Sequence, residues 1–219
     1  RDVLGSRGLG DVYKRQEQLK AAEKMLNGAY FLQLLPGDLP APDALHMLVL
    51  QTHSNPEAEV VFADEDSVID GIRQNPIFKP DYGRDTLRSF NSIGRPMLVS
   101  KRVHTAVGGF RGSTPAELWA YCIDCASAAK QVIHIARIGL TVIRDCDGSE
   151  IPCTDILKRE FNSLYPGDGS GKKNRTNGYC FEGSVLGTLR MRYPRKREPS
   201  VGIVIAGADG VENLQRCID

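Results

Sequence analysis

The sequence predicts an α/β domain, because apolar strand patterns flank a helical pattern in the first third of the chain. Residues 30–35 and 60–63 are short apolar runs of the kind found in strands covered on both faces. Between them a helical pattern begins at Pro42, and Pro56 prevents it from continuing. The length of 219 residues corresponds to one domain, or to one domain and part of another.

Composition excludes several classes of protein. With 28 basic and 27 acidic residues, no overall charge attracts the chain to nucleic acid or to an anionic membrane. The 41% hydrophobic content excludes disorder throughout. No apolar run approaches the roughly 20 residues that a membrane-spanning helix needs. The 6 cysteines are too sparse for a small disulfide scaffold, so we expect a cytoplasmic setting, with association at the inner face of the membrane left open.

The two ends of the sequence indicate a segment cut from a longer protein. Residues 1–16 are polar, rich in glycine and similar to translated adaptor or vector sequence, so we expect a non-native leader there. At the other end, an apolar strand is predicted over 200–206, and the helix predicted from Val211 is interrupted at Asp219.

The first half of the fold is predicted to bring acidic residues to strand ends. A helix is expected from Glu17 to Ala29, followed by the strand over 30–35 and a turn over 36–38 that contains Asp38. The strand over 60–63 ends at Asp64, Glu65 and Asp66. Because ligands bind at the carboxyl ends of strands in open α/β sheets, this placement predicts a binding site. The residues of the helix from Pro42 that are predicted to face the core are Leu45, Leu48 and Val49.

The middle of the chain is predicted to start with a long polar connection over 67–94, a kind of segment that is usually functional. Several shorter elements should follow it. They are a strand over 96–99, a helix capped by Ser100 and stopped by Gly108 and Gly109, a helix over 117–129 that carries Cys122 and Cys125, and a strand over 132–138. The two cysteines lack a second pair or histidines at ligand spacing, so no zinc site is expected.

The last third is predicted to be a connector. Thr154 is placed to cap a helix, and residues 166–178 have the composition of a flexible linker. Residues 172–197 contain eight basic residues and one acid, Glu182. We interpret this run as a solvated linker. Contact with nucleic acid is the weaker alternative, because no recognised nucleic-acid module is present.

Several segments, in a fixed order, resemble family 2 glycosyltransferases with the GT-A fold, in particular tandem enzymes of O-antigen or rhamnan-type polysaccharide assembly. They are LNGAYFLQLLPGDLPAPDAL, EVVFADED, FKPDYGRDTL, GGFRGSTPAELWAY and HIARIG within residues 25–144, and MRYPRKREPSVGIVIAGADGVENLQRCID at the C-terminal end.

The resemblance implies four parts. After the leader at 1–16, residues 17–150 would be a partial GT-A (Rossmann-like) domain lacking its N-terminal nucleotide-binding strands. Residues 151–198 would be a helix and basic linker, and 199–219 the first βα unit of a second such domain.

The function implied is transfer of a sugar from a nucleotide-sugar donor to a hydroxyl of a polysaccharide or glycan acceptor. The parent protein would be an enzyme of the hexosyltransferase type, and we expect this fragment alone to be inactive. The alternative is a degenerate GT-A domain that binds carbohydrate or serves as a scaffold.

The resemblance also implies a set of site residues. Asp38 is the one acid retained from the family's strand-end aspartate motif, and it would bind a divalent metal, Mg²⁺ or Mn²⁺. Glu117 would act as the catalytic base, since the matching acids are replaced by Ala120 and Cys122. A purely structural role for Glu117, and a solvated turn for the acid cluster, are the alternatives. The residues implied to surround donor and acceptor are Asp38, Asp64, Glu65, Asp66, Lys79, Asp81 and Arg144.

Overall fold

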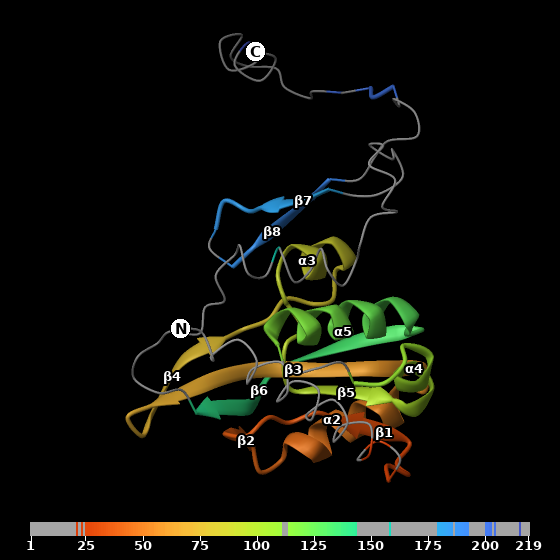
Figure 1. Cartoon of the computed structure of the whole chain (residues 1–219), viewed down its shortest axis with the longest axis vertical. Helices are drawn as coiled ribbons and strands as arrows, with labels where there is room; N and C mark the ends of the chain where they lie inside the picture. Colours follow the sequence, from red (N-terminus) through yellow and green to blue (C-terminus); the bar gives the residue numbers. More distant parts are fainter. Residues whose placement is uncertain are drawn as a thin grey trace, which may run out of the picture.

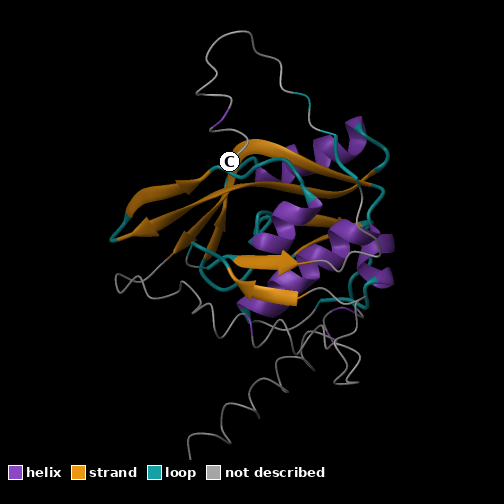
Figure 2. Cartoon of the chain, turned by 90° about the horizontal axis from the view of Figure 1, so that it is seen from above, coloured by secondary structure: helices purple, strands orange, loops and turns teal. Residues whose placement is uncertain are grey.

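The structure is a computed structural model, shown in Figure 1 and, from above, in Figure 2. It describes residues 21, 23, 25–110, 114–143, 158, 179–185, 187–192, 200–202, 204 and 215. The strands are β1 (Tyr30–Leu32), β2 (Asp38–Pro40), β3 (Ala58–Ile69), β4 (Ile72–Ile77), β5 (Met97–Ser100), β6 (Gln131–Ile143), β7 (Tyr179–Glu182) and β8 (Leu189–Arg192). The helices are α2 (Ala44–Ser54), α3 (Arg84–Ser89), α4 (Lys101–Ala106) and α5 (Pro115–Ala128).

The main sheet is mixed and has the strand order β1-β5-β3-β6-β2, with β4 also paired to β3. Strand β3 runs parallel to β6 along one edge. Along its other edge it pairs antiparallel first with β5, over 60–62, and then with β4, over 65–69. Helices cover both faces of this curled sheet, as Figure 1 shows for α5 on one side and α2 on the other. The predicted α/β class is confirmed, and the architecture is compatible with a Rossmann-like fold.

The core lies on both faces of β3 because successive side chains of a strand point to opposite sides. Val60 and Phe62 pack with α5 and its neighbours, in a cluster that includes Trp119. Val61 and Ala63 pack on the opposite face against Ala44, Met47 and Leu48 of α2. The apolar run over 60–63 was therefore predicted correctly as a strand that is covered on both faces.

Two predictions about the N-terminal half were wrong in detail. The strand predicted over 30–35 is limited to β1, at one end of the sheet, where only Phe31 is buried. On α2, Leu48 faces the core as expected, but Leu45 is 60% and Val49 44% exposed. The buried side of α2 is instead formed by Ala44, Met47 and Leu48, because the helix meets the sheet along a narrow stripe one position away from the predicted one.

The acid cluster does not end a strand. Strand β3 continues through residues 64–66 to Ile69 and turns at Asp70 and Gly71, both with positive φ, into β4. The segment 67–94, predicted as an irregular polar connection, therefore contains β4 and also α3. All six residues of β4 are exposed, so no core-facing apolar pattern marks it in the sequence. Pro76 fits there because proline is tolerated on an edge strand.

The elements with strong local signals were predicted well. The Ser100 side chain accepts a hydrogen bond from the Val103 N–H at the start of α4, and Gly108 and Gly109 follow the helix with positive φ. Helix α5 covers 115–128, close to the predicted 117–129. The strand predicted over 132–138 is present as the longer β6, which extends to Ile143.

Part of the predicted linker forms a hairpin. Strands β7 and β8 pair antiparallel, and the buried Leu189 belongs to the same core cluster as Trp119. The leader at 1–16, the segment 166–178 and the helix capped by Thr154, apart from Lys158, lie outside the described residues. Of the strand predicted over 200–206, residues 200–202 and 204 are described and are not in a strand. Within the described part of the chain, no helix is long and apolar enough to cross a membrane.

Candidate functional site

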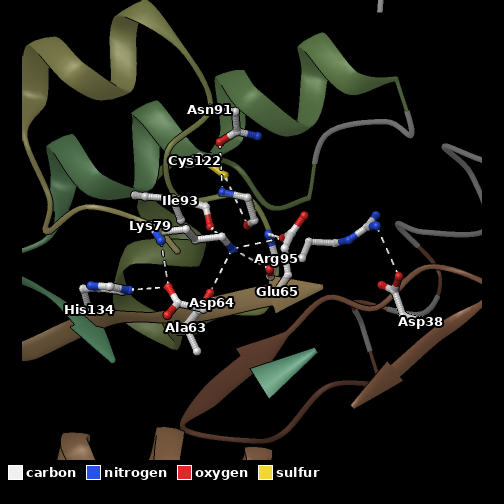
Figure 3. A network of polar contacts seen from close by, with 11 residues as sticks. Asp38, Ala63, Asp64, Glu65, Lys79, Asn91, Ile93, Arg95, Cys122 and His134 are labelled. Atoms are coloured by element: carbon white, nitrogen blue, oxygen red, sulfur yellow. Dashed lines mark hydrogen bonds and ion pairs between the residues drawn. The ribbon is translucent and has the colours of Figure 1, made fainter. Parts of the chain in front are cut away.

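The acid cluster lies where β3 changes its pairing partner. Strand β5 pairs with β3 up to Phe62, and β4 pairs with it from Glu65 onward. The register with β6 also shifts on either side of Asp64. Backbone groups at such a junction lose regular strand partners and must be satisfied in another way. Loop residues and Lys79 fill this gap (Figure 3).

Lys79 is the centre of the junction. Its Nζ donates to the carbonyl oxygens of Ala63 (2.8 Å), Ile93 (2.8 Å) and Arg95 (2.6 Å), and it lies 3.0 Å from Glu65 Oε2. Its side chain is 3% exposed, and burial lowers its pKa while the nearby Glu65 carboxylate opposes that shift. The contacts occupy the ammonium fully, so Lys79 holds the loop over 91–96 against β3. A direct contact of Lys79 with donor or acceptor stays a prediction.

The loop over 91–96 approaches the two charged groups closely. Gly94 has φ +53°, and a Cβ at this position would lie 3.3 Å from Glu65 Oε2 and 3.4 Å from Lys79 Nζ. The Gly94 N–H donates to Asn91 Oδ1 (3.0 Å), and the Arg95 N–H donates to Glu65 Oε2 (3.3 Å). A residue without a side chain is therefore needed at Gly94 to bring the loop onto Glu65.

Arg95 extends from this loop to Asp38. Arg95 Nη2 lies 3.1 Å from Asp38 Oδ1, and the Leu35 N–H donates to Asp38 Oδ2 (2.8 Å). The Asp38 side chain is 1% exposed and that of Arg95 is 22% exposed. Asp38 thus lies beneath a guanidinium, at the opposite end of the network from His134 (Figure 3).

His134 links two acids at the other end. Its Nε2 lies 2.8 Å from Asp64 Oδ1, and its Nδ1 lies 3.3 Å from Asp81 Oδ1. The ring is stacked on Phe62 with centroids 4.8 Å apart. Asp64 also accepts the Lys79 N–H (2.9 Å), whereas the Asp81 side chain is 96% exposed. The imidazole therefore connects a buried carboxylate to a solvent-exposed one.

The structure joins five of the residues implied by the resemblance into one network, in which Arg95 and His134 are the bridging residues. They are Asp38, Asp64, Glu65, Lys79 and Asp81. Asp66 lies apart and pairs with Arg73 (2.7 Å), and within the described residues its buried Oδ1 has no hydrogen-bond partner. Glu117 closes the N-terminal turn of α5, where its carboxylate contacts Thr114. Arg144 lies outside the described residues.

A divalent metal does not fit the described residues as they stand. Both Asp38 oxygens are engaged, one by a cation and one by a backbone N–H. Among the residues that the structure describes, no three side chains of histidine, cysteine, aspartate or glutamate converge as a metal site. Mg²⁺ beside substrate phosphates is usually held by one or two carboxylates, and at Asp38 both oxygens already have partners.

Sequence reasoning did not select Arg95 or His134. His134 is one of four histidines scattered along the chain, and only its place in the HIARIG segment distinguished it. Arg95 directly precedes the strand over 96–99, where no motif marks it. Both residues gain their role from partners more than fifty positions away, so no local pattern in the sequence indicates it.

Comparison with known proteins gives two distant relatives. No family model matches the sequence. An uncharacterized protein, y4gI, of Sinorhizobium fredii (strain NBRC 101917 / NGR234) is 32% identical over 207 residues, which cover 91% of this chain and 22% of the relative. The O-antigen biosynthesis protein RfbC of Myxococcus xanthus is 25% identical over 190 residues, which cover 83% of this chain and 14% of the relative. The chain therefore spans less than a quarter of the length of these relatives.

Proposed function

We propose that this chain is part of a family 2 glycosyltransferase with the GT-A fold, which transfers a sugar from a nucleotide-sugar donor to a glycan acceptor during polysaccharide assembly. The observation that carries the proposal is the contact network that links Asp38 to Asp81. This network joins residues that the family resemblance had implied from separate segments of the sequence. The relative named as an O-antigen biosynthesis protein supports a role in polysaccharide biosynthesis. If the protein acts at the inner face of the membrane, it would associate with that face peripherally.

The proposal includes the division of the chain into four parts. Residues 1–16 are a leader, 17–150 the partial catalytic-type domain, 151–198 a connector and 199–219 the start of a second domain. The purified chain is expected to show no turnover of a sugar donor, because Glu117, the acid implied as its base, is engaged in a helix cap.

In this proposal Asp38 and Arg95 lie at the donor end of the network. Lys79, Glu65 and Asp64 hold the loop and the strand in place, and Asp81 is the exposed acid on the acceptor side. Glu117 is better explained as part of a helix cap than as a base, so the acid that accepts the proton of the acceptor hydroxyl is expected outside α5.

A second candidate function is a non-catalytic module that binds carbohydrate or supports an active tandem partner. The observation that favours it is the engagement of Asp38 by Arg95, which leaves no free carboxylate at the position of the aspartate motif. Donor binding distinguishes the two candidates, since a scaffold needs none.

The test is calorimetric titration of the purified chain with a panel of UDP-, dTDP- and GDP-sugars. A remnant donor site is expected to bind at least one of them, with weaker binding in Asp38→Asn, because Asp38 positions the Arg95 guanidinium. Asp43→Asn is the matched control, because Asp43 also pairs with an arginine, Arg137 (2.8 Å), but on the surface. Absence of binding by every nucleotide sugar, or equal effects of the two variants, would reject the donor site and favour the scaffold.

A further inference from the structure

The Asp38 carboxylate is buried behind the cation that pairs with it. Its side chain is 1% exposed, whereas the Arg95 side chain is 22% exposed. A group that arrives from solvent therefore meets the guanidinium before it meets the carboxylate. A metal cation would have to displace Arg95 against charge repulsion, while an anion would be attracted to it.

The hydrogen-bonding capacity of the two partners also differs. Asp38 Oδ1 faces Arg95 Nη2, and Oδ2 accepts the Leu35 N–H, so each oxygen has a partner. A guanidinium has five N–H donors in a planar fork that matches phosphate oxygens. The shortest contact with Asp38, 3.1 Å, is made by one nitrogen of that fork, Nη2.

Arg95 is also held at its backbone. Its N–H donates to Glu65 Oε2 (3.3 Å), and its carbonyl oxygen accepts from Lys79 Nζ (2.6 Å). Lys79 is buried and also bonded to Ala63 and Ile93, so the anchor belongs to the core of the network. A fixed cation loses less entropy when it binds an anion than a mobile one does.

We propose that Arg95, in place of a divalent metal, binds the diphosphate of the donor at this site. The inference rests on the proposed function for the identity of the ligand. It assigns a role to a residue that the aspartate motif does not include, and it accounts for the leucine and glycine at positions 35 and 37, where carboxylates for a metal would otherwise be expected. An arginine that meets the diphosphate directly supplies the positive charge that favours its binding and its departure.

The test uses the purified chain and two probes, inorganic pyrophosphate in the presence of EDTA and Mn²⁺ alone. Pyrophosphate is expected to bind without metal, and Arg95→Gln is expected to weaken it by about tenfold or more, the effect of losing a hydrogen bond between charged groups. Arg137→Gln is the matched control, because Arg137 also pairs with an aspartate, Asp43, but in an exposed pair that is not part of the network. Binding of pyrophosphate that is equal in Arg95→Gln and the wild type would overturn the proposal.

The Mn²⁺ titration, followed by electron paramagnetic resonance, decides the question without relying on the fold of Arg95→Gln. No binding at Asp38 is expected. One Mn²⁺ bound by the wild type and lost in Asp38→Asn would overturn the proposal. Arg95→Lys keeps the charge but not the fork, so intermediate pyrophosphate affinity is expected.

The outcomes separate this inference from the proposed function. Pyrophosphate binding at Arg95 with no affinity for any nucleotide sugar would keep the inference about an anion site and remove the glycosyltransferase proposal. Nucleotide-sugar binding that requires Mn²⁺ would keep the proposed function and reject Arg95 as the replacement for the metal.

Discussion

The carboxylate of Glu117 and the hydroxyl of Thr114 cap the same helix end reciprocally. Glu117 Oε2 accepts from the Thr114 N–H (3.2 Å) and hydroxyl (3.0 Å), and Thr114 Oγ1 accepts from the Glu117 N–H (3.2 Å). This is a capping box, which satisfies backbone N–H groups that a helix start leaves unpaired. The residue selected as a catalytic base thus has a complete structural role.

The cap predicts a specific order of stabilities. Thr114→Ala should lower the free energy of unfolding by about 1 kcal/mol, because the N-cap acceptor is lost. Glu117→Gln should stay close to the wild type, because glutamine closes the same box. Urea denaturation followed by circular dichroism measures both. A larger loss in Glu117→Gln than in Thr114→Ala would show that the charge of Glu117 has a role beyond the cap.

The elements that the sequence predicted well carry their signals locally. The Ser100 cap, the glycine pair after α4 and the apolar spacing of α5 each involve residues within a few positions of one another. Strand β4 escaped prediction because its six residues are all exposed and have no apolar side to recognise. The end of the strand at Asp64 was misplaced for a related reason, since polar residues in a strand interior look like a turn in the sequence.

The acidic residues of the candidate site could be predicted from the sequence, but the contacts that join them could not. Asp38, Glu65 and Lys79 were selected through the family resemblance, and the structure joins them. The joining residue, Arg95, lies 3.1 Å from Asp38 only because β5, β3, β6 and β2 lie in that order in the sheet. Strand order is a tertiary property, and no periodicity or capping motif in the sequence indicates it.

Lys79 is expected to be essential for the stability of this region. Lys79→Met removes a buried ammonium and leaves the Glu65 carboxylate, 15% exposed, without its cation. Breaking a buried pair in this way costs about 3–5 kcal/mol. Lys130→Met is the matched control, because Lys130 Nζ is also 3.0 Å from a glutamate, Glu57, but both side chains are exposed. That variant should lose no more than about 1 kcal/mol in urea denaturation. Equal losses in the two variants would contradict the role of Lys79 in the core of the network.

His104 should make the stability of the fold depend on pH. The ring is buried between Phe31 and Phe110, with Nδ1 2.8 Å from the Tyr121 hydroxyl. Burial lowers its pKa from 6.5, an effect that Glu23 partly offsets. Below about pH 6.5 the unfolded chain therefore binds a proton more readily than the folded chain does. This contribution to stability is complete above that pH and is lost as the pH falls toward the lower pKa of the folded state.

The measurement compares wild type with His104→Gln, in which glutamine can keep a hydrogen bond to Tyr121 but does not titrate. The free energy of unfolding of the wild type should fall more steeply between about pH 7 and pH 5 than that of the variant. The other three histidines are present in both proteins, so the difference between the curves isolates His104. Parallel curves would exclude His104 as the source of the pH dependence.

Cys122 should be unreactive in the folded protein. Its side chain lies on the buried face of α5, in the core cluster, and burial raises the pKa of the thiol to about 12. At about pH 8 only about one molecule in ten thousand would carry the reactive thiolate. Iodoacetamide labelling, read by mass spectrometry of the peptide containing Cys122, should therefore be negligible in buffer and complete in denaturant. Rapid labelling in buffer would show that α5 opens readily.

Gly139 is expected to tolerate no side chain, because three neighbours surround it. A Cβ there would lie 2.7 Å from Met47 Cε, 3.1 Å from Ala63 Cβ and 3.1 Å from Pro96 Cγ. The end of Met47 can rotate away, but Ala63 belongs to β3 and Pro96 is a rigid ring, so the backbone must shift. Gly139→Ala should therefore lower the free energy of unfolding by about 1–3 kcal/mol, the usual cost of overpacking.

The control for Gly139 is Gly202→Ala, since a Cβ at Gly202 meets no atom within 4 Å and its φ is not positive. That variant should unfold at the same urea concentration as the wild type. Because Pro96 directly follows Arg95, the shift forced by Gly139→Ala should also disturb the Arg95 side chain over Asp38. We therefore expect this variant to bind pyrophosphate more weakly than Gly202→Ala, even under conditions where both are fully folded. Equal stability and equal pyrophosphate affinity in the two variants would show that the sheet accommodates a methyl group at Gly139 without moving Pro96.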